Sequence, residues 1–430
     1  MHVLLIPSEE FIPPHNKLDG IFQYHQAVIL KESGHRVGVL SVRLSFSVPM
    51  IAKGIAMRFF GKKTGNETDK HSILSLVKLG FNKVFRPQHF VHSETIDGLT
   101  VFRVDGLFLK PPKDNKNHLS WIRAGLACFE EYQKKEGVPD VIHAHNAIYA
   151  GMLAAEIKRR YGLRYILTEH SSTYAMKKLE GDIVHLVKKA YDGASGLIAV
   201  SQAFADLLNK LFSFQRFHYL PNVLDQQLEK FPYKPIATNG NKFIFLHIAV
   251  LLPVKDQATL LQAFQLVVRH NPAAELWIGG NGELLDTLRR QAESLQIQDS
   301  VKFLGLLNRE EVINRIQACD CFVLSSKYET FGVVVIEAML FGKPVIVTRC
   351  GVGQSLVDEK IGYVVDVGDA EKLAGAMQKM MNTSSSYDPE HIRRVTIDQF
   401  GKDAFVRKIN KIYSEVVSPL QNPSKRHLIK

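Results

Sequence analysis

The chain lacks any long uninterrupted apolar segment. No stretch approaches the roughly 18 consecutive apolar residues of a membrane-spanning helix, so we expect no such helix. The apolar run Val3–Ile6 ends at Pro7 and is too short for the core of a secretory signal. We therefore expect a protein that is not exported by that route and that works in the cytoplasm.

Cysteine is also scarce. Four cysteines in 430 residues are too few for a disulfide scaffold and fit a reducing compartment. Short internal repeats and low-complexity tracts are absent. Hydrophobic residues make up 46% and charged residues 23% of the chain, which is typical of globular proteins and excludes disordered and fibrous classes. At roughly 100–200 residues per domain, the length predicts two or three domains.

Basic residues exceed acidic ones, and the formal net charge is +11. Such a chain attracts nucleic acid, anionic lipid or phosphorylated small molecules, and net charge alone does not choose among them. Much of the excess lies in residues 45–95, where eight Lys and Arg residues stand against three acidic residues. Because this segment shows no clear periodic pattern, we interpret it as a basic insertion.

Short apolar segments of β character alternate with helical patterns along most of the chain. Strands separated by helices imply right-handed crossovers and parallel sheets that are covered on both faces. Residues 231–241 contain Pro, Gly and Asn, are typical of a linker, and separate two such series. The sequence predicts an α/β fold with two doubly wound, Rossmann-like domains facing each other across a cleft. We place these domains at 1–230 and 242–400, followed by a C-terminal helix and tail at 401–430.

The strongest chemical signal is a helix that is apolar on every face and yet contains an acid. Residues 333–342 read Val-Val-Val-Ile-Glu-Ala-Met-Leu-Phe-Gly, with Glu337 among them. A buried carboxylate costs several kcal/mol unless a partner compensates it. Two explanations stay open: a bound ligand needs Glu337, or a buried Arg or Lys pairs with it for structure alone.

Glu329 and Gly332 stand just before this helix, where free N–H groups favour bound anions. Eight helical residues rise about 12 Å. A diphosphate at the helix start could therefore have a sugar near one carboxylate and a ribose near the other.

Glu329 and Glu337 form an E-x7-E pattern, and together with Phe331-Gly332 and Glu337-Ala338-Met339 they resemble retaining glycosyltransferase family 4. Members of this family are glycogen-synthase-like nucleotide-sugar transferases of GT-B fold. The resemblance covers most of residues 243–382. In the N-terminal half it rests on shorter motifs, namely Gly20-Ile21-Phe22, Asp140–His145, Thr168–Ser171 and Ala199–Ser201. It implies a GT-B fold whose C-terminal helix returns to the N-terminal domain.

The resemblance also implies roles for the residues around the apolar helix. Glu329 would hydrogen-bond hydroxyls of the donor sugar, and Glu337 would hold the ribose. The backbone N–H groups of Phe331, Gly332 and Val333 would meet the diphosphate, whose negative charge grows as the glycosidic bond breaks.

Four further residues are expected to take part. Lys255 would neutralise the departing phosphate, although a solvated lysine at a helix start is the alternative. His170 would lie beside the donor sugar and the reaction centre, unless it is a loop residue with structural hydrogen bonds. Gly20 would let backbone approach the donor phosphates or the acceptor, unless it is an ordinary turn residue. Gly280 belongs to the donor-side turn, which lacks the order of a Walker loop.

This chain departs from the family before Lys255, where Ala249-Val250 replaces the usual Gly-Arg and removes a second phosphate cation. Either Lys255 acts alone or another cation substitutes for the arginine. His143 and His145 alternate on an expected strand, but no spaced Cys or carboxylate completes a metal site, which favours packing. We expect no metal and no cofactor, with the nucleotide-sugar donor acting as substrate.

Residues 50–63, wound as a helix, place Ile51, Ile55 and Phe59 on one arc with Lys53 and Arg58 beside it. The pattern predicts contact with an anionic membrane surface. A helix that caps the N-terminal domain with a solvated basic edge is the alternative.

These observations predict a retaining, metal-independent, hexosyltransferase-like glycosyltransferase. It would move a sugar from a nucleotide-diphosphate donor to a glycan or lipid-linked acceptor in cell-surface polysaccharide biosynthesis. We expect a cytoplasmic enzyme, peripheral at the inner face of the cell membrane. Alternatives are a nucleotide-sugar epimerase or phosphorylase of the same fold, or a non-catalytic basic binding protein. Nucleic acid is not an expected partner, because the excess cations lie in one insertion instead of over an aromatic-rich face.

Overall fold

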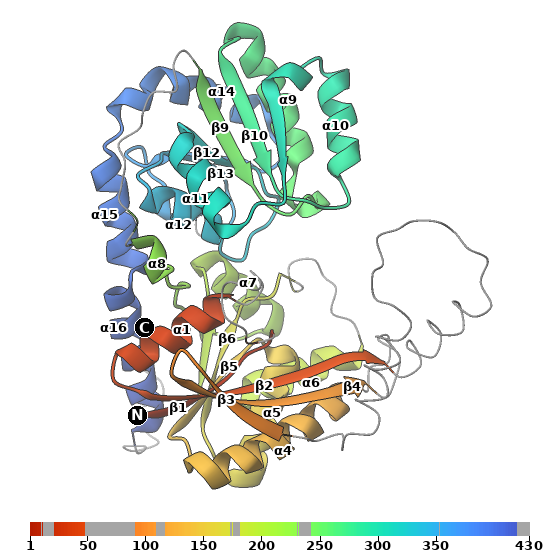
Figure 1. Ribbon diagram of the computed structural model, residues 1–430, viewed down its shortest axis with the longest axis vertical. Helices are drawn as coiled ribbons and strands as arrows, with labels where there is room; N and C mark the ends of the chain where they lie inside the picture. Colours follow the sequence, from red (N-terminus) through yellow and green to blue (C-terminus); the bar gives the residue numbers. More distant parts are fainter. Residues whose placement is uncertain are drawn as a thin grey trace, which may run out of the picture. The chain divides into compact units, whose positions relative to one another are not determined.

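The computed structural model describes residues 1–9, 11, 21–47, 91–108, 117–172, 174, 181–229, 231, 242–351 and 353–418. The chain forms two compact units. The first unit comprises Met1–Glu169, Lys177–Ile198 and Ile409–Lys430, and the second comprises His170–Met176 and Ala199–Lys408. Each unit contains strands and helices of an α/β fold (Figure 1). The domain bounds inferred above from the sequence stay a prediction.

The first sheet has eight strands in the order β3-β4-β2-β1-β5-β6-β7-β8. Its strands are β1 (His2–Ile6), β2 (Arg36–Ser47), β3 (Val91–Ile96), β4 (Leu99–Phe108), β5 (Val141–His145), β6 (Tyr165–Glu169), β7 (Gly196–Ala199) and β8 (Phe217–Tyr219). The pairs β4–β2, β2–β1, β1–β5 and β5–β6 are parallel, and β3 pairs antiparallel with β4. Residues 3–6 of β1 are buried, as the predicted cover on both faces requires.

Helices on this sheet include α5, which packs against both α4 and α6. The helices and the one-turn element of the first unit are α1 (Ile21–Glu32), α4 (Asn117–Glu136), η1 (Ala147–Gly151), α5 (Met152–Tyr161) and α6 (Asp182–Gly193). The C-terminal helix α16 (Lys402–Val417) joins them from residue 409 onward. Its Tyr413 hydroxyl bonds His143 Nδ1 at 2.8 Å, and Asn410 Oδ1 bonds His35 Nε2 at 2.7 Å. The predicted return of the C-terminal helix to the N-terminal sheet is confirmed.

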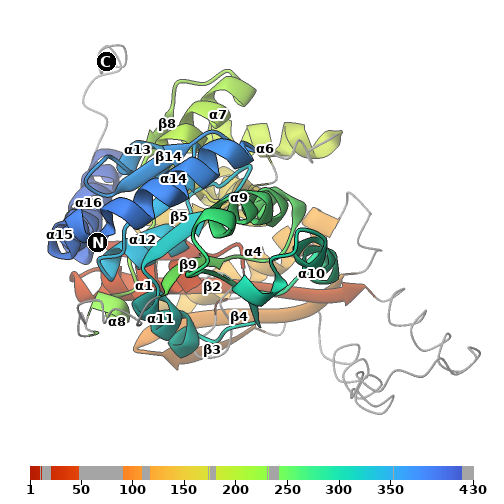
Figure 2. The same cartoon turned by 90° about the horizontal axis from the view of Figure 1, so that it is seen from above.

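The second sheet has six strands in the order β11-β10-β9-β12-β13-β14, all paired in parallel. Its strands are β9 (Phe243–Ile248), β10 (Ala274–Gly279), β11 (Val301–Gly305), β12 (Cys321–Leu324), β13 (Val345–Thr348) and β14 (Gly362–Val365). The remaining helices are α7 (Gln202–Phe212), α8 (Gln226–Glu229), η2 (Pro253–Lys255), α9 (Gln257–His270), α10 (Leu285–Ser294), η3 (Gln298–Ser300), α11 (Arg309–Ala318), α12 (Val333–Leu340), α13 (Gly353–Leu356), α14 (Ala370–Thr383), η4 (Ser384–Ser386) and α15 (Pro389–Phe400). Viewed from above, α9 and α10 lie on one side of β9, and α11 and α12 on the other (Figure 2). Two parallel-sheet α/β units of this kind confirm the predicted fold class.

Helix α12 is the apolar helix of the sequence, and residues 335–340 are all buried. A buried lysine lies close to its C-terminal end. The Lys343 ammonium group donates to the carbonyl oxygens of Gln317 and Cys319 at 2.8 Å each, and so caps the end of α11. These bonds compensate the burial of the lysine, although burial still lowers its pKa.

The basic insertion proposed at 45–95 is described only at its two ends. Residues 45–47 end β2 and residues 91–95 form most of β3, so the ends of the segment carry regular strands that the sequence pattern did not reveal. The 50–63 segment and Gly20 lie outside the described residues. None of the helices in the described part of the chain is long and apolar enough to cross a membrane.

Candidate active site

Three predicted site residues of the second unit lie in the segments that follow parallel strands. Lys255 comes after β9, Gly280 after β10, and Glu329 after β12. Since β9, β10 and β12 are neighbours in one parallel sheet, these loops leave the same edge. That edge is where doubly wound sheets bind their ligands.

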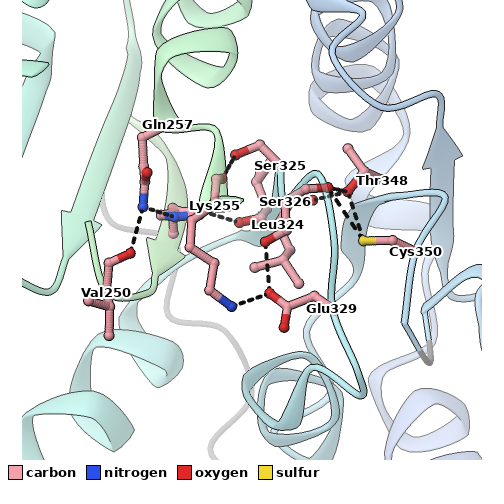
Figure 3. A network of polar contacts seen from close by, with 11 residues as sticks. Val250, Lys255, Gln257, Leu324, Ser325, Ser326, Glu329, Thr348 and Cys350 are labelled. Carbon is pink, nitrogen blue, oxygen red and sulfur yellow. Dashed lines mark hydrogen bonds and ion pairs between the residues drawn. The ribbon is translucent and has the colours of Figure 1, made fainter. Parts of the chain in front are cut away.

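Lys255 and Glu329 form an ion pair at this edge. Lys255 Nζ lies 2.5 Å from Glu329 Oε1, and the Ser326 hydroxyl donates to the same oxygen at 2.7 Å (Figure 3). The side chains are 23% and 11% exposed, so both are largely removed from water. Glu329 Oε2 accepts no hydrogen bond from any described residue. Lys255 is therefore not the freely solvated lysine of the alternative interpretation.

Hydrogen bonds to main-chain carbonyl oxygens connect the segments that contain Lys255 and Glu329. The Ser325 hydroxyl donates to the Lys255 carbonyl oxygen at 3.0 Å, and the Lys327 amide donates to the Val254 carbonyl oxygen at 2.8 Å. The Thr348 hydroxyl donates to the Ser326 carbonyl oxygen at 2.6 Å (Figure 3). The segments after β9 and β12 are thereby linked to each other and to the end of β13, which positions Lys255 and Glu329 relative to each other.

The backbone at the start of α12 is shaped by two glycines. Gly332, at the N-cap, has φ = 94°, and no side chain caps the helix start. Gly351 has φ = 61°, and a Cβ there would lie 2.7 Å from both Glu329 Cβ and the Phe331 carbonyl oxygen. The Phe331 ring is buried against Phe400 with ring centroids 5.7 Å apart. The helix start therefore presents backbone instead of side chain toward a ligand.

Gly280 has a structural reason to be glycine. Its φ is 126°, and a Cβ at this position would lie 1.9 Å from the Ala249 carbonyl oxygen. The turn after β10 thus rests directly on the backbone after β9. Val250, at the position where the family has arginine, is exposed, and its carbonyl oxygen accepts from Gln257 Nε2 at 3.3 Å. A donor contact by Gly280 stays a prediction.

Glu337 is only 7% exposed and is paired with an arginine. Arg309 Nη1 lies 2.8 Å from Glu337 Oε1, and Arg309 Nη2 lies 3.2 Å from Asp225 Oδ2. This is the buried partner that the purely structural explanation required, so burial of the acid alone is no evidence for a ligand. The pair uses only one carboxylate oxygen of Glu337.

Burial and the ion pair act in opposite directions on these charges. Burial raises the pKa of Glu337, and Arg309 only partly offsets this effect. Burial acts to lower the pKa of Arg309, but the attraction of Glu337 and Asp225 outweighs it, and the net direction is upward. Arg309 therefore stays charged, and an acid next to it has a permanent counter-ion.

Comparison with known proteins adds an independent observation. The family described as Glycosyl transferases group 1 matches residues 231–399, and the family Glycosyltransferase Family 4 matches residues 83–228. The two matches are adjacent and in order. The chain is a member of glycosyltransferase family 4.

Curated relatives of this family 4 enzyme cover most of its length. It is 24% identical over 367 residues to N-acetyl-alpha-D-glucosaminyl L-malate synthase of Bacillus anthracis, covering 82% of this chain and 90% of that one. It is also 24% identical over 328 residues to alpha-monoglucosyldiacylglycerol synthase of Streptococcus pneumoniae, covering 71% and 72%.

Solved structures agree on the fold of the glycosyltransferase. Sucrose-phosphate synthase from Thermosynechococcus elongatus superposes with a TM-score of 0.68 at 18% identity, covering 96% of this chain and 98% of that one. Anabaena Alr3699/HepE, in complex with UDP and glucose, superposes with a TM-score of 0.64 at 18% identity, covering 96% of this chain and 99% of that one. These likenesses establish the GT-B fold for the family 4 chain.

The motif Thr168–Ser171 is buried at Thr168 and Glu169 and partly buried at His170 and Ser171. Glu169 accepts hydrogen bonds from the Ala147 amide and the Tyr191 hydroxyl at 2.9 Å each. His170 follows β6 directly and is partly buried, and its place beside the donor sugar stays a prediction. His143 and His145 are buried and stacked, with ring centroids 4.5 Å apart, which confirms the packing interpretation.

Sequence reasoning missed Arg309 as the partner of Glu337. The two residues are far apart in the chain, and nothing around Arg309 distinguishes it from other basic residues at helix starts. Asp225 ends the Asn222–Asp225 element, which resembles a family motif without indicating a contact. Among the residues that the structure describes, no group of three or more His, Cys, Asp or Glu side chains is arranged to hold a metal ion.

Proposed function

We propose that this glycosyltransferase uses a nucleoside-diphosphate sugar as donor and transfers a hexose or a related sugar with retention of anomeric configuration. The acceptor is a hydroxyl of a glycan or of a lipid-linked glycan in cell-surface polysaccharide biosynthesis. In this proposal the reaction needs no metal ion.

The Lys255–Glu329 pair beside the start of α12 carries the proposal. A cation about 4 Å from an anion interacts by roughly 4 kcal/mol at an effective dielectric constant of 20, before desolvation is subtracted. Lys255 and the N–H groups of residues 331–333 would together meet a leaving diphosphate, whose charge grows in the transition state. This arrangement supports diphosphate stabilisation by protein groups alone.

Glu329 gains its role when the donor binds. In the structure Lys255 is the counter-ion of Glu329. A diphosphate would compete for that ammonium group and leave Glu329 to accept hydrogen bonds from sugar hydroxyls. Oxygen Oε2, which no described residue engages, is available for the first of them. An oxygen of the departing phosphate would then take the proton of the acceptor hydroxyl that attacks from the same face.

Arg309 makes Glu337 compatible with ribose binding. A guanidinium that engages one carboxylate oxygen fixes the orientation of the carboxylate and leaves the other oxygen for a ligand. Glu337 would use this oxygen to accept from the ribose hydroxyls. The ion pair is then part of the donor site, and Arg309 is a positioning residue.

The acceptor class is supported by the printed activities of relatives. Alpha-monoglucosyldiacylglycerol synthase of Streptococcus pneumoniae is named for a glycolipid. A mannosyltransferase of Corynebacterium glutamicum, 33% identical over 159 residues that cover 35% of this chain, is named for an acylated phosphatidylinositol monomannoside. We propose a cytoplasmic enzyme, peripheral at the inner membrane face through residues 50–63.

A ligand panel tests the donor class. UDP, GDP, ADP and their sugars are added singly, and the melting temperature is recorded. A ligand that binds only the native state at one hundred times its Kd stabilises it by about 2.7 kcal/mol, which shifts the melting temperature measurably. NMR of the product with the selected donor then reads the anomeric configuration. A donor that is epimerised without any acceptor would instead favour the epimerase alternative.

A further inference from the structure

The first unit contains a groove that has no part in the donor site. It measures about 680 Å³ and lies among α4, α5 and α6. Its lining includes Leu119, Ile122, Met152, Ala155, Leu186 and Ala190. Proteins bind organic ligands in concave sites of about 300–1,000 Å³ with mainly apolar walls. The groove therefore has the size and the wall chemistry of a binding site for hydrocarbon.

Cations surround this apolar surface. The charged residues that line it are Arg123, Lys158, Arg159, Arg160 and Lys189 against Glu156 and Asp192. Arg159 and Arg160 both bond Glu156, and Lys158 donates to the Gly193 carbonyl oxygen at 2.8 Å. Arg123 and Lys189 are exposed and have no ion pair or hydrogen bond within the described ranges. Two cations on different helices are thus available to an anionic group.

Helix α4 combines both chemistries on one ridge. Leu119 is 46% exposed, and Arg123 follows it one helical turn later. An exposed apolar side chain beside a cation is the pattern of a surface that meets lipid, where the apolar group enters the acyl region and the cation meets headgroup phosphate.

Other ligand classes fit the groove less well. A nucleotide or a nucleic acid needs exposed aromatic rings for stacking, whereas Tyr165 of the lining is buried and its hydroxyl bonds the Ala190 carbonyl oxygen. The other ring of the lining, the imidazole of His118, belongs to a residue that is only partly exposed. A free sugar needs several convergent polar groups, and the walls are mainly apolar. We propose that this groove holds an acyl chain of an acidic membrane phospholipid, with Arg123 and Lys189 at the phosphate.

This site would be separate from the 50–63 segment and from the donor residues of the second unit. Its occupant need not be a substrate, so the proposal does not depend on the proposed function. It gives the enzyme a lipid contact within helices that the structure describes.

Photo-crosslinking and vesicle sedimentation test the proposal directly. The full chain is incubated with vesicles of phosphatidylcholine alone or with 30% phosphatidylglycerol, part of which carries a photoreactive group on one acyl chain. We expect cosedimentation with the anionic vesicles and cross-linked peptides from α4, α5 or α6. Cross-links that avoid these three helices would overturn the assignment.

Variants separate the groove from general electrostatic attraction. Ala155→Trp fills the groove without changing charge, and Arg123→Glu with Lys189→Glu reverses the two available cations. Each should reduce cross-linking in the groove at least tenfold. The charge-matched control Lys210→Glu with Lys411→Glu, at exposed lysines outside the lining, should leave it within twofold.

Circular dichroism confirms that each variant is folded, and the uncharged Leu119→Asn at the exposed ridge replaces Ala155→Trp if tryptophan prevents folding. Equal losses in the Arg123→Glu/Lys189→Glu variant and in the charge-matched control would show attraction by net charge and overturn the proposal. So would cross-linking that disappears on deletion of residues 50–63 but survives filling of the groove.

Discussion

Arg309 holds Glu337 through one guanidinium nitrogen, Nη1 to Oε1 at 2.8 Å, and uses the other, Nη2, to hold Asp225 at 3.2 Å. The arginine therefore links an acid on the buried helix α12 to an acid just before α8. Removing one member of a buried ion pair costs about 3–5 kcal/mol because the other charge is left without a partner. The arrangement serves structure in any case, and its role in donor binding needs a separate test.

The first prediction concerns Arg309 and the ribose. In Arg309→Met, Glu337 loses the group that orients its carboxylate. We expect the donor KM to rise at least tenfold with a smaller change in kcat. The preference for a ribose donor over its 2′-deoxyribose analogue should fall toward one, because the carboxylate no longer meets the hydroxyl in a fixed geometry. Steady-state kinetics with both donors measures this.

Arg309→Lys and Arg290→Met serve as controls for this experiment. Lysine keeps the positive charge but lacks the two planar nitrogens with which arginine contacts two acids. The Lys variant should therefore give an intermediate ribose preference. Arg290, on α10, has no ion pair among the described residues, and its variant should behave as wild type. A Met variant that is destabilised but still discriminates ribose would assign Arg309 a structural role only.

The second prediction concerns the Lys255–Glu329 pair. Glu329→Gln and Lys255→Met should each lower kcat by about 10²-fold or more, since in the proposed mechanism Glu329 holds the donor sugar and Lys255 meets the charge that develops on the diphosphate. Ser326→Ala, which removes one donor to Glu329 Oε1, should have a smaller effect. Wild-type turnover in a folded Glu329→Gln or Lys255→Met variant would remove the corresponding assignment.

The third prediction concerns the glycines of the loops. Gly280→Ala would place a Cβ 1.9 Å from the Ala249 carbonyl oxygen at a left-handed φ, and we expect it to lower the free energy of unfolding by about 2 kcal/mol. Gly351→Ala should in addition reduce turnover, because its Cβ would displace Glu329. Chemical denaturation measures the first effect and donor kinetics the second.

Gly375→Ala is the matched control for the glycine variants. Gly375 lies on the exposed side of α14, and a Cβ there meets nothing within 4 Å. Alanine is the better helix former, so this variant should be more stable by about 0.5–1 kcal/mol. Equal behaviour of Gly280→Ala and Gly375→Ala would contradict the close packing of the turn.

The fourth prediction concerns acid sensitivity. Burial lowers the pKa of His247 to about 4, from an ordinary 6.5. The unfolded chain therefore binds a proton at higher pH than the folded chain, and stability is lost as the pH falls from 6.5 to 4. The loss from this one group is about 3 kcal/mol, at 1.36 kcal/mol for each unit of pKa. Urea unfolding at a series of pH values should show that the free energy of unfolding decreases as the pH falls from 6.5 to 4.

His247→Asn identifies the group responsible. An asparagine can donate to the Val323 carbonyl oxygen and accept from Gln257, the contacts that His247 makes at 3.0 and 3.3 Å. The variant should flatten the pH profile between 6.5 and 4. His218→Asn, at an exposed histidine, should leave the profile unchanged. An unaltered slope in His247→Asn would show that other groups cause the acid sensitivity.

The fifth prediction concerns residues 50–63. Their deletion should weaken binding to anionic vesicles, because each near-surface cation contributes about 1 kcal/mol on an acidic leaflet. Activity toward a water-soluble acceptor should persist. If the deletion variant sediments with anionic vesicles as strongly as the full chain does, residues 50–63 do not bind the membrane.

The sequence indicated the two sheets because buried parallel strands have a local signature. Residues 3–6, 321–324 and 345–347 are continuous apolar runs between helical patterns, and each forms part of a parallel sheet. The β3–β4 hairpin was missed because its strands carry polar residues, such as Glu94 and Arg103, that bond each other across the pair. Polar and apolar residues alternate in these strands because they form a sheet edge that is partly exposed to solvent. A search for continuous apolar runs does not detect such strands.

The proposed donor site was predictable in its residue types but not in its pairings. The acid inside an apolar helix and the lysine after a strand are visible in the sequence. Which oxygen Lys255 contacts, and which arginine reaches Glu337, depends on how distant loops converge. The tight contact of Gly280 with Ala249 depends on the same convergence.

The hydrogen bonds that link the segments around Lys255 and Glu329 end on main-chain carbonyl oxygens. This fact indicates how donor selectivity could be altered. The carbonyl oxygen of Val254 accepts from the Lys327 amide whatever side chain residue 254 carries. A library that varies residue 254 while retaining Lys255, Ser325, Ser326 and Thr348 would therefore sample new donor preferences on an unchanged framework.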